Sequence, residues 1–232
     1  MRKLTGITGA LALSALSANA AIVAGDVIGF DFGNNGVSST TANWNELTDA
    51  PNNTVATVND PMRLSDGAPV TGVTFTFDFT VGNSGSNNGA QTGASIGFPD
   101  NVQNDNFFEN NAEQWELKFT GLDPSLTYIL TVGSYWPVGS SATQDENRNT
   151  GWQVGATQLV ALATDADDSY VTFTGITPTG TGGDEIVLTT WDYNSNPVST
   201  ISALTLTAVP EPSSTALLGL GALGLLARRR RH

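Results

Sequence analysis

The amino-acid sequence predicts an all-β fold, an antiparallel β-sandwich of the jelly-roll type. Short segments alternate apolar and polar residues, turns rich in Gly, Asn and Pro separate them, and no long segment has the 3.6-residue period of a helix. No internal repeat is present, which disfavours a β-propeller or a β-helix. We expect the sandwich at residues 21–208, flanked by an N-terminal signal peptide and a C-terminal hydrophobic helix.

Two segments carry the alternation most clearly. Residues 73–81 place valine and phenylalanine on one face and threonine and aspartate on the other. Residues 114–120 place Trp115 inward and Glu116 and Lys118 outward. One face of each strand therefore packs into a core while the other meets water.

The remaining segments are shorter and are separated by turns. We expect 126–133 to pair antiparallel with 114–120, 40–51 to form a loop or one helical turn, and 82–93 to form a loop. Residues 101–111 are polar, and Phe107 and Phe108 are expected to tuck inward. Further strands are expected at 27–32, 54–58, 95–98, 151–154, 158–162, 170–174, 185–191 and 200–209.

Composition excludes several kinds of chemistry. The chain has no cysteine, so it has neither disulfides nor thiol catalysis. Its one histidine, His232, lies outside the predicted domain, which removes Ser-His triads and His-ligated metals. Residues 21–209 hold three basic residues against twenty-one carboxylates, a net charge of −18. Such a domain repels nucleic acid and anionic membranes, and it suits cations, saline surroundings or neutral sugars.

Two local patterns resemble catalytic or metal sites. Residues 93–97 match the G-x-S-x-G elbow of hydrolases, but Ser95 lacks a histidine base and Lys118 is expected on an exposed strand face. Asp165, Asp167 and Asp168, and separately residues 104–106, offer oxygen ligands for calcium without the EF-hand spacing. We therefore expect no catalytic residue and no cofactor, and structural calcium stays open beside the alternative of solvated turn carboxylates.

Residues 1–20 have the features of a secretory signal peptide. Arg2 and Lys3 precede an apolar segment of small residues, and Ala18 and Ala20 form an A-x-A cleavage site. Cleavage there would make Ala21 the new N-terminus.

The C-terminus has three parts in order. Pro210, Glu211 and Pro212 form an extended motif, because each proline fixes its own φ and biases the residue before it. Residues 213–227 are uncharged and form a short candidate membrane helix of about 22 Å. A cationic cytoplasmic stop follows, consisting of Arg228, Arg229, Arg230 and Arg231.

This order of parts over residues 209–232 resembles the PEP-CTERM sorting signal of bacterial envelope proteins. The resemblance implies recognition by an exosortase, a membrane-embedded processing enzyme that removes or transfers the C-terminal segment. It also implies an envelope or extracellular-matrix destination, often linked to exopolysaccharide, with the membrane as a partner before processing. An uncleaved membrane anchor is the alternative.

Aromatic residues near predicted strand ends are the candidates for ligand binding, because aromatic rings stack on sugars. These are Trp136, Trp152 and Trp191, whereas Trp115 is expected in the core. Residues 119–124, 126–128 and 171–173 resemble carbohydrate-binding jelly rolls of the galactose-binding and malectin kind. We expect a non-enzymatic, exported protein with polysaccharide as the candidate ligand. A carboxylate-dependent carbohydrate-active hydrolase and a pure scaffold are the alternatives.

Overall fold

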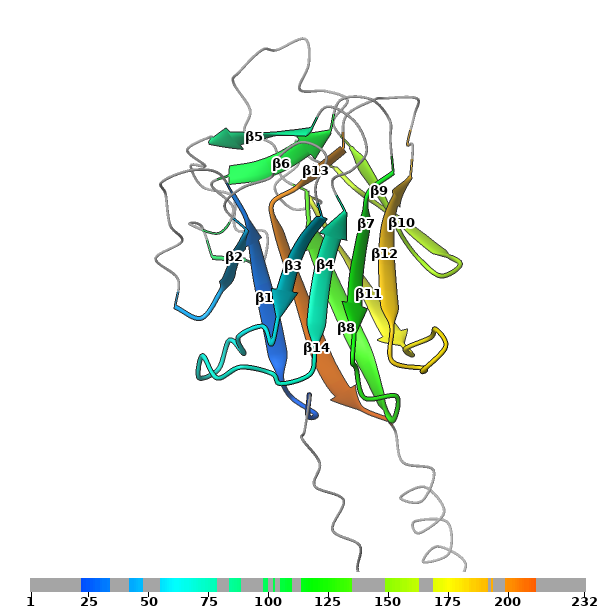
Figure 1. The fold of residues 1–232 in the computed structure, drawn as a ribbon. Coiled ribbons are helices and arrows are strands. Elements are labelled where there is room, and N and C mark those ends of the chain that lie inside the picture. Colours follow the sequence, from blue (N-terminus) through cyan, green and yellow to red (C-terminus); the bar gives the residue numbers. More distant parts are fainter. Residues whose placement is uncertain are drawn as a thin grey trace, which may run out of the picture.

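The computed structural model describes residues 22–33, 42–47, 55–78, 84–88, 98–99, 102, 105–109, 114–134, 149–162, 169–191, 193 and 199–211. Within these residues the chain forms strands and turns and no α-helix (Figure 1). None of them belongs to a helix that is long and apolar enough to cross a membrane. The predicted signal peptide and hydrophobic helix lie outside the described residues.

The strands form two large sheets and one small one. In spatial order, sheet A holds β11 (Tyr170–Ile176), β8 (Leu126–Gly133), β14 (Ala203–Pro210), β1 (Val27–Phe32) and β2 (Asn45–Leu47). Sheet B holds β10 (Thr157–Ala161), β9 (Thr150–Val154), β12 (Ile186–Trp191), β7 (Glu116–Thr120), β4 (Thr74–Asp78) and β3 (Val55–Asn59). A cap sheet at one end of the sandwich holds β13 (Ser199–Ile201), β6 (Asp105–Glu109) and β5 (Ser84–Asn88) (Figure 1).

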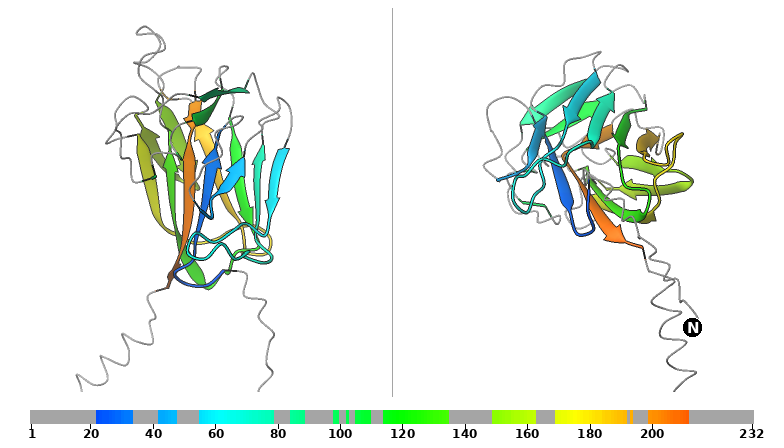
Figure 2. Two further views of the ribbon diagram at one scale, coloured as in Figure 1. Left: turned by 90° about the vertical axis from the view of Figure 1, so that its left-hand side faces the viewer. Right: turned by 60° about the horizontal axis from the view of Figure 1, so that its bottom comes forward.

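The topology is that of a jelly roll, as the sequence predicts. The jelly-roll strands, in chain order, are β1, β7, β8, β9, β10, β11, β12 and β14. When they are numbered from one to eight, sheet A has the order 1-8-3-6 and sheet B the order 2-7-4-5. β3 and β4 extend sheet B, and β2 extends sheet A by a parallel pairing with β1. Figure 2 shows the first strand, β1 in blue, beside the last, β14 in orange.

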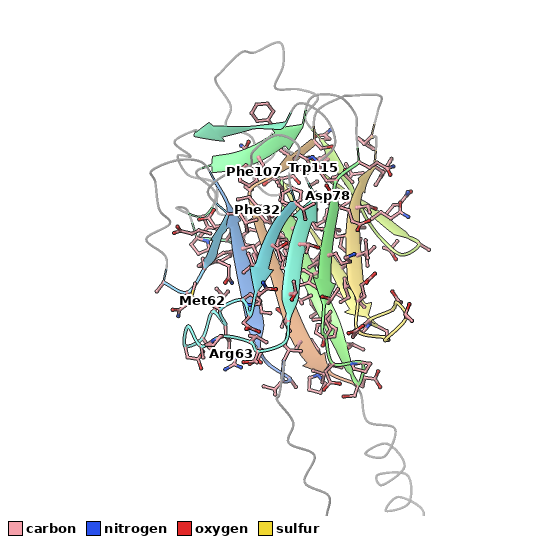
Figure 3. The ribbon with its side chains drawn as sticks, in the orientation of Figure 1. Phe32, Met62, Arg63, Asp78, Phe107 and Trp115 are labelled. Atoms are coloured by element: carbon pink, nitrogen blue, oxygen red, sulfur yellow. The ribbon has the colours of Figure 1, made fainter. Side chains whose placement is uncertain are left out.

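Aromatic rings fill the space between the two sheets. Phe30 of sheet A stacks on Phe75 of sheet B with ring centroids 4.0 Å apart. Phe32 contacts Phe107 of the cap sheet at 6.0 Å, so the cap closes the core at that end (Figure 3). Trp115 is fully buried, which confirms its expected place in the core. Each such ring stabilises the fold by roughly 1.5–3 kcal/mol.

The predicted pairing of 126–133 with 114–120 is wrong. β7 lies in sheet B and β8 in sheet A, so residues 121–125 carry the chain from one sheet to the other. Gly121 has a φ of 74° and packs against the carbonyl of Gly72, where a Cβ would clash. The Tyr128 hydroxyl then accepts from the Asp123 N–H at 3.0 Å and lies 3.1 Å from the Asp123 carbonyl, to which it donates. This corner replaces the expected hairpin.

Two segments expected to be loops contain strands. β2 lies within 40–51, and the buried Asn45 side chain fixes it by donating to the Gly29 carbonyl at 2.8 Å and accepting from the Met62 N–H at 2.7 Å. β5 lies within 82–93 and pairs with β6. In both cases the partner strand determines the conformation more strongly than the local composition does. Phe107 of β6 is buried, as expected.

Candidate functional site

The outer face of sheet B carries the one predicted ligand-binding residue that the structure leaves partly exposed. Along β12, Ile186, Leu188 and Thr190 are buried, which turns the alternate residues, Trp191 among them, to the outer face. Trp191 lies opposite Gly151 of β9. A Cβ at Gly151 would lie 2.5 Å from Cε2 of the indole, so the ring rests directly on the glycine backbone. Only glycine permits this close contact.

Tyr193 completes an aromatic corner with Trp191. The two rings meet edge to face, with centroids 5.5 Å apart and an interplanar angle of 87°. Both residues are half-buried. We use the name aromatic corner for Gly151, Trp191 and Tyr193.

A row of hydrogen-bonding side chains crosses the sheet beside the aromatic corner. Strand register aligns one outward residue from each of five neighbouring strands, and this polar row is Gln158, Gln153, Thr189, Glu116 and Asp78. It covers four inter-strand spacings, roughly 19 Å.

Several contacts fix side chains of the polar row. The Gln158 amide donates to Gln153 at 2.9 Å, and Gln153 donates to the Gly155 carbonyl at 2.7 Å. Glu116 lies 3.8 Å from Lys118, and Asp78 stands at the cap end of β4 (Figure 3). The face therefore offers amide, hydroxyl and carboxylate groups next to an aromatic ring.

The prediction for Trp152 is wrong. Its side chain is fully buried, and its indole N–H donates to Ser134 Oγ at 2.7 Å across the sandwich. The residue sits on the inward side of β9, and the position near a strand end did not reveal its direction. Trp136 lies outside the described residues.

The other candidate sites stay untested or are not assembled. Ser95 and Asp165, Asp167 and Asp168 lie outside the described residues, as does Asn104. Asp105 and Asn106 belong to β6, where Asn106 is fully buried. Within the described ranges no three or more acidic, His or Cys residues come close enough to hold a metal ion. Structural calcium stays a prediction.

Sequence reasoning missed a groove between the edge strands β10 and β11. It has a volume of about 490 Å³, and Leu159, Phe173 and Ile186 form part of its apolar wall. Threonines of β10, β11 and the following segment form much of its rim, and Glu185 is the one ionisable residue among those that line it. The sequence predicted strands at 158–162 and 170–174, but the gap between the sheets depends on tertiary packing.

The predicted sorting motif begins inside the last strand. β14 includes Val209 and Pro210, with Pro210 opposite Leu126 of β8, and Glu211 follows as an exposed residue. Pro212 and the cationic stop at Arg228, Arg229, Arg230 and Arg231 lie outside the described residues. So do the predicted cleavage residues Ala18, Ala20 and Ala21.

The fold and this C-terminal segment define a class, a jelly-roll sandwich joined directly to a sorting signal. Residues 208–231 match the family model of the PEP-CTERM protein-sorting motif. The match marks an exported protein of the cell envelope that is anchored transiently in the membrane, and it implies processing by an exosortase.

Comparisons of the whole chain add little to this. No curated protein matches it. Among solved structures it is similar to the exo-beta-1,3-galactanase of Phanerochaete chrysosporium with galactose, at 13% identity and a TM-score of 0.27. That similarity covers 63% of this chain and 36% of the galactanase chain.

Proposed function

We propose that this protein is a non-enzymatic component of the cell envelope that binds a neutral polysaccharide through the outer face of sheet B. One observation carries the proposal: the Trp191 ring packs directly on Gly151 and stays partly exposed on the outer face of sheet B. An aromatic ring fixed in this way can stack on the apolar face of a sugar without losing rotamer freedom.

The polar row supplies the complementary hydrogen bonds. Sugar hydroxyls both donate and accept, and the row offers amides at Gln153 and Gln158 and a hydroxyl at Thr189. The net charge of −18 over residues 21–209 disfavours anionic polymers. A neutral chain lying along the row and against the aromatic corner fits both features.

Binding is favoured over hydrolysis by the exposure of Glu116 on this face. A glycosidase holds one carboxyl group protonated in an apolar environment beside a second carboxylate. Glu116 and Asp78 are register partners on the open outer face, and Glu116 is exposed beside Lys118. Glu116 therefore lies in a solvated environment, where it serves as a hydrogen-bond acceptor.

The test is binding of the full chain, in detergent, to arrays of neutral and anionic polysaccharides with and without calcium. We expect binding to a neutral polymer that Trp191→Ala weakens by about tenfold, the loss of roughly 1.4 kcal/mol. Tyr170→Ala is the matched control, because Tyr170 is a 39% exposed aromatic on β11 of sheet A. It should bind like the wild type.

Three results would count against the proposal. Binding to no polysaccharide would leave a scaffold, and equal losses for Trp191→Ala and Tyr170→Ala would move the site away from sheet B. Release of reducing sugar that Glu116→Gln abolishes would make the protein a hydrolase.

A further inference from the structure

The last strand is held firmly up to Ala208 and only weakly beyond it. The Gly25 N–H donates to the Ala208 carbonyl at 2.8 Å, and the Ala208 N–H donates to the Asp26 carbonyl at 2.9 Å. Ala208 is also buried. Two hydrogen bonds from the N-terminal segment therefore fix this residue on the β1 side while β8 pairs with it on the other.

The N-terminal segment that holds Ala208 is itself fixed. The Val23 N–H donates to Asp26 Oδ2 at 2.8 Å. Asp26 Oδ1 lies 2.8 Å from Arg63 Nε, a close ion pair rather than an aligned hydrogen bond. Figure 3 shows Arg63 beside the start of β1, at the end of the sandwich opposite the cap sheet.

Beyond Ala208 the strand pairs with β8 alone among the strands that the structure describes. Val209 and Pro210 pair with Thr127 and Leu126 of β8, while β1 begins at Val27, opposite Thr207. Pro210 has no N–H to donate. Separating these two residues from β8 is the inexpensive fraying of a strand end, whereas separating Ala208 breaks its bonds to Gly25 and Asp26.

The sorting motif thus starts within two residues of the fixed end of the strand. At about 3.3 Å per residue, an enzyme that binds the extended Pro210-Glu211 segment works roughly 7 Å from the folded sandwich. That distance is smaller than the radius of a protein domain, so the enzyme must accommodate the end of the sandwich as well as the motif.

This end is uncharged around the strand and acidic at its margin. Val23, 45% exposed, comes just before Gly25, whose N–H binds Ala208 on the β1 side of β14. The exposed Pro124 and Ser125 come just before Leu126, which pairs with Pro210 on the β8 side. Asp123, Asp184 and Glu211 add negative charge, while Arg63 is already paired with Asp26 and Asp66. Anionic lipid headgroups would be repelled, so a protein surface is the better partner.

We propose that the terminal end of the sandwich, formed by Val23, Pro124 and Ser125 around Pro210, docks on the exosortase during removal of the sorting segment. The proposal rests on the sorting-motif match and is independent of polysaccharide binding. Val23 and Pro124 are positioning residues, because they hold the enzyme against a motif that has no spacer.

The test follows processing of the full chain in its native host. Intact mass and pulse-chase give the rate at which the C-terminal segment is lost. Val23→Arg and Pro124→Arg should each slow this loss by roughly fivefold or more, the effect of disturbing one well-packed interface contact. Val55→Arg is the matched control, because Val55 is 51% exposed on β3 and pairs with Asp78 near the cap sheet.

A spacer variant separates docking from folding. A flexible Gly/Ser insertion of about six residues between Val209 and Pro210 moves the motif away from the sandwich. When Val23→Arg or Pro124→Arg is added to the spacer variant, the chain should be processed as fast as the spacer variant without it. A folding defect would instead slow processing with or without the spacer. The same mass spectra report the N-terminus, so an effect of Val23→Arg on signal-peptide removal is visible.

Several results would overturn the proposal. Processing of both arginine variants at the wild-type rate would show that the motif alone is recognised. A slowing that persists in the spacer background would place the effect in the fold. A wild-type chain that keeps its sorting segment would mean that no docking partner acts on it.

Discussion

Each large sheet has a tryptophan packed on a glycine, but one of these tryptophans is buried and the other is partly exposed. On sheet A, Trp44 lies over Gly29 of β1, where a Cβ would come within 3.0 Å of the ring. On sheet B, Trp191 lies over Gly151, where a Cβ would come within 2.5 Å of the ring. Trp44 is 7% exposed and joins Phe98, Val102, Ala203 and Leu64 in a second small core, whereas Trp191 is half-buried beside Tyr193.

The difference comes from what covers each ring. Beside β2, the Arg63 segment borders β1, with Ile28 bridged to Arg63 and the Leu64 N–H donating to the Val27 carbonyl. Leu64 from this segment, together with Phe98 and Val102, packs against Trp44. The uncovered part of that face carries threonines, of which Thr131 and Thr172 are hydrogen-bonded at 3.1 Å. Whether a tryptophan packed on a glycine belongs to the core or to a candidate binding surface therefore depends on whether another segment of the chain covers the ring.

Removing an aromatic ring that contacts both sheets should have the largest effect on the stability of the fold. Phe75 is fully buried and stacks on Phe30 across the sandwich. Phe75→Ala should cost about 3–5 kcal/mol of unfolding free energy, through lost burial and the cavity left behind. Denaturant unfolding measures it. A loss below about 1 kcal/mol would mean that the sheets do not depend on this contact.

A methyl group under the covered tryptophan should destabilise the fold. Gly29→Ala places a Cβ 2.9 Å from Leu64 Cδ2 and 3.0 Å from Trp44, both confined by the second core. We expect a loss of about 1–3 kcal/mol from overpacking, measured by denaturant unfolding. Binding to polysaccharide by the folded fraction should not change. Wild-type stability would show that Trp44 can move.

The corner between the sheets depends on the Tyr128 hydroxyl. Tyr128→Phe leaves the Asp123 N–H and carbonyl without this partner and should cost about 1 kcal/mol. Burial raises the pKa of Tyr128 to about 12, and the Asp123 charge adds to the rise while the backbone hydrogen bond opposes it.

The raised pKa fixes the sign of the pH effect. The pKa of Tyr128 is higher in the folded protein than in the unfolded chain. The stability that its protonated hydroxyl contributes is therefore complete below about pH 10 and is lost as pH rises toward 12. Unfolding midpoints measured across that window should fall less steeply for Tyr128→Phe than for wild type. Parallel curves would exclude the linkage.

A methyl group under the half-buried tryptophan should have the smallest effect on stability. Gly151→Ala displaces the Trp191 ring toward solvent, where it can move, so the cost should stay within about 1 kcal/mol. Polysaccharide binding should still fall, by about tenfold, because the ring leaves its fixed position. The pair Gly29→Ala and Gly151→Ala thus separates stability from binding, and equal effects on both properties would remove the contrast between the faces.

The fold was predictable because the alternation of apolar and polar residues shows which side chains of a strand point toward the core. The segments at β4 and β7 showed their buried faces in the sequence. The jelly roll followed from the number of short strand segments and from the absence of helical periodicity. β2 and β5 were missed because they are short and polar and depend on a partner strand.

The site was predictable only in part. Trp191 became a candidate through its type and its position near a strand end, and the structure leaves it partly exposed. The same reasoning failed for Trp152, which points inward. Residues that lie opposite each other on paired strands point to the same face, so the strand register decides such cases. Trp152 lies opposite Leu159, and Gly151 lies opposite Trp191. A single sequence does not supply that register.

The pairing of β1 with β14 also determines when the sandwich can close. The first of the described strands pairs with the last, so sheet A stays incomplete until β14 is in place. The residues that complete it are followed at once by the sorting motif. Closure of the sandwich therefore requires a chain that already extends to the start of the sorting motif.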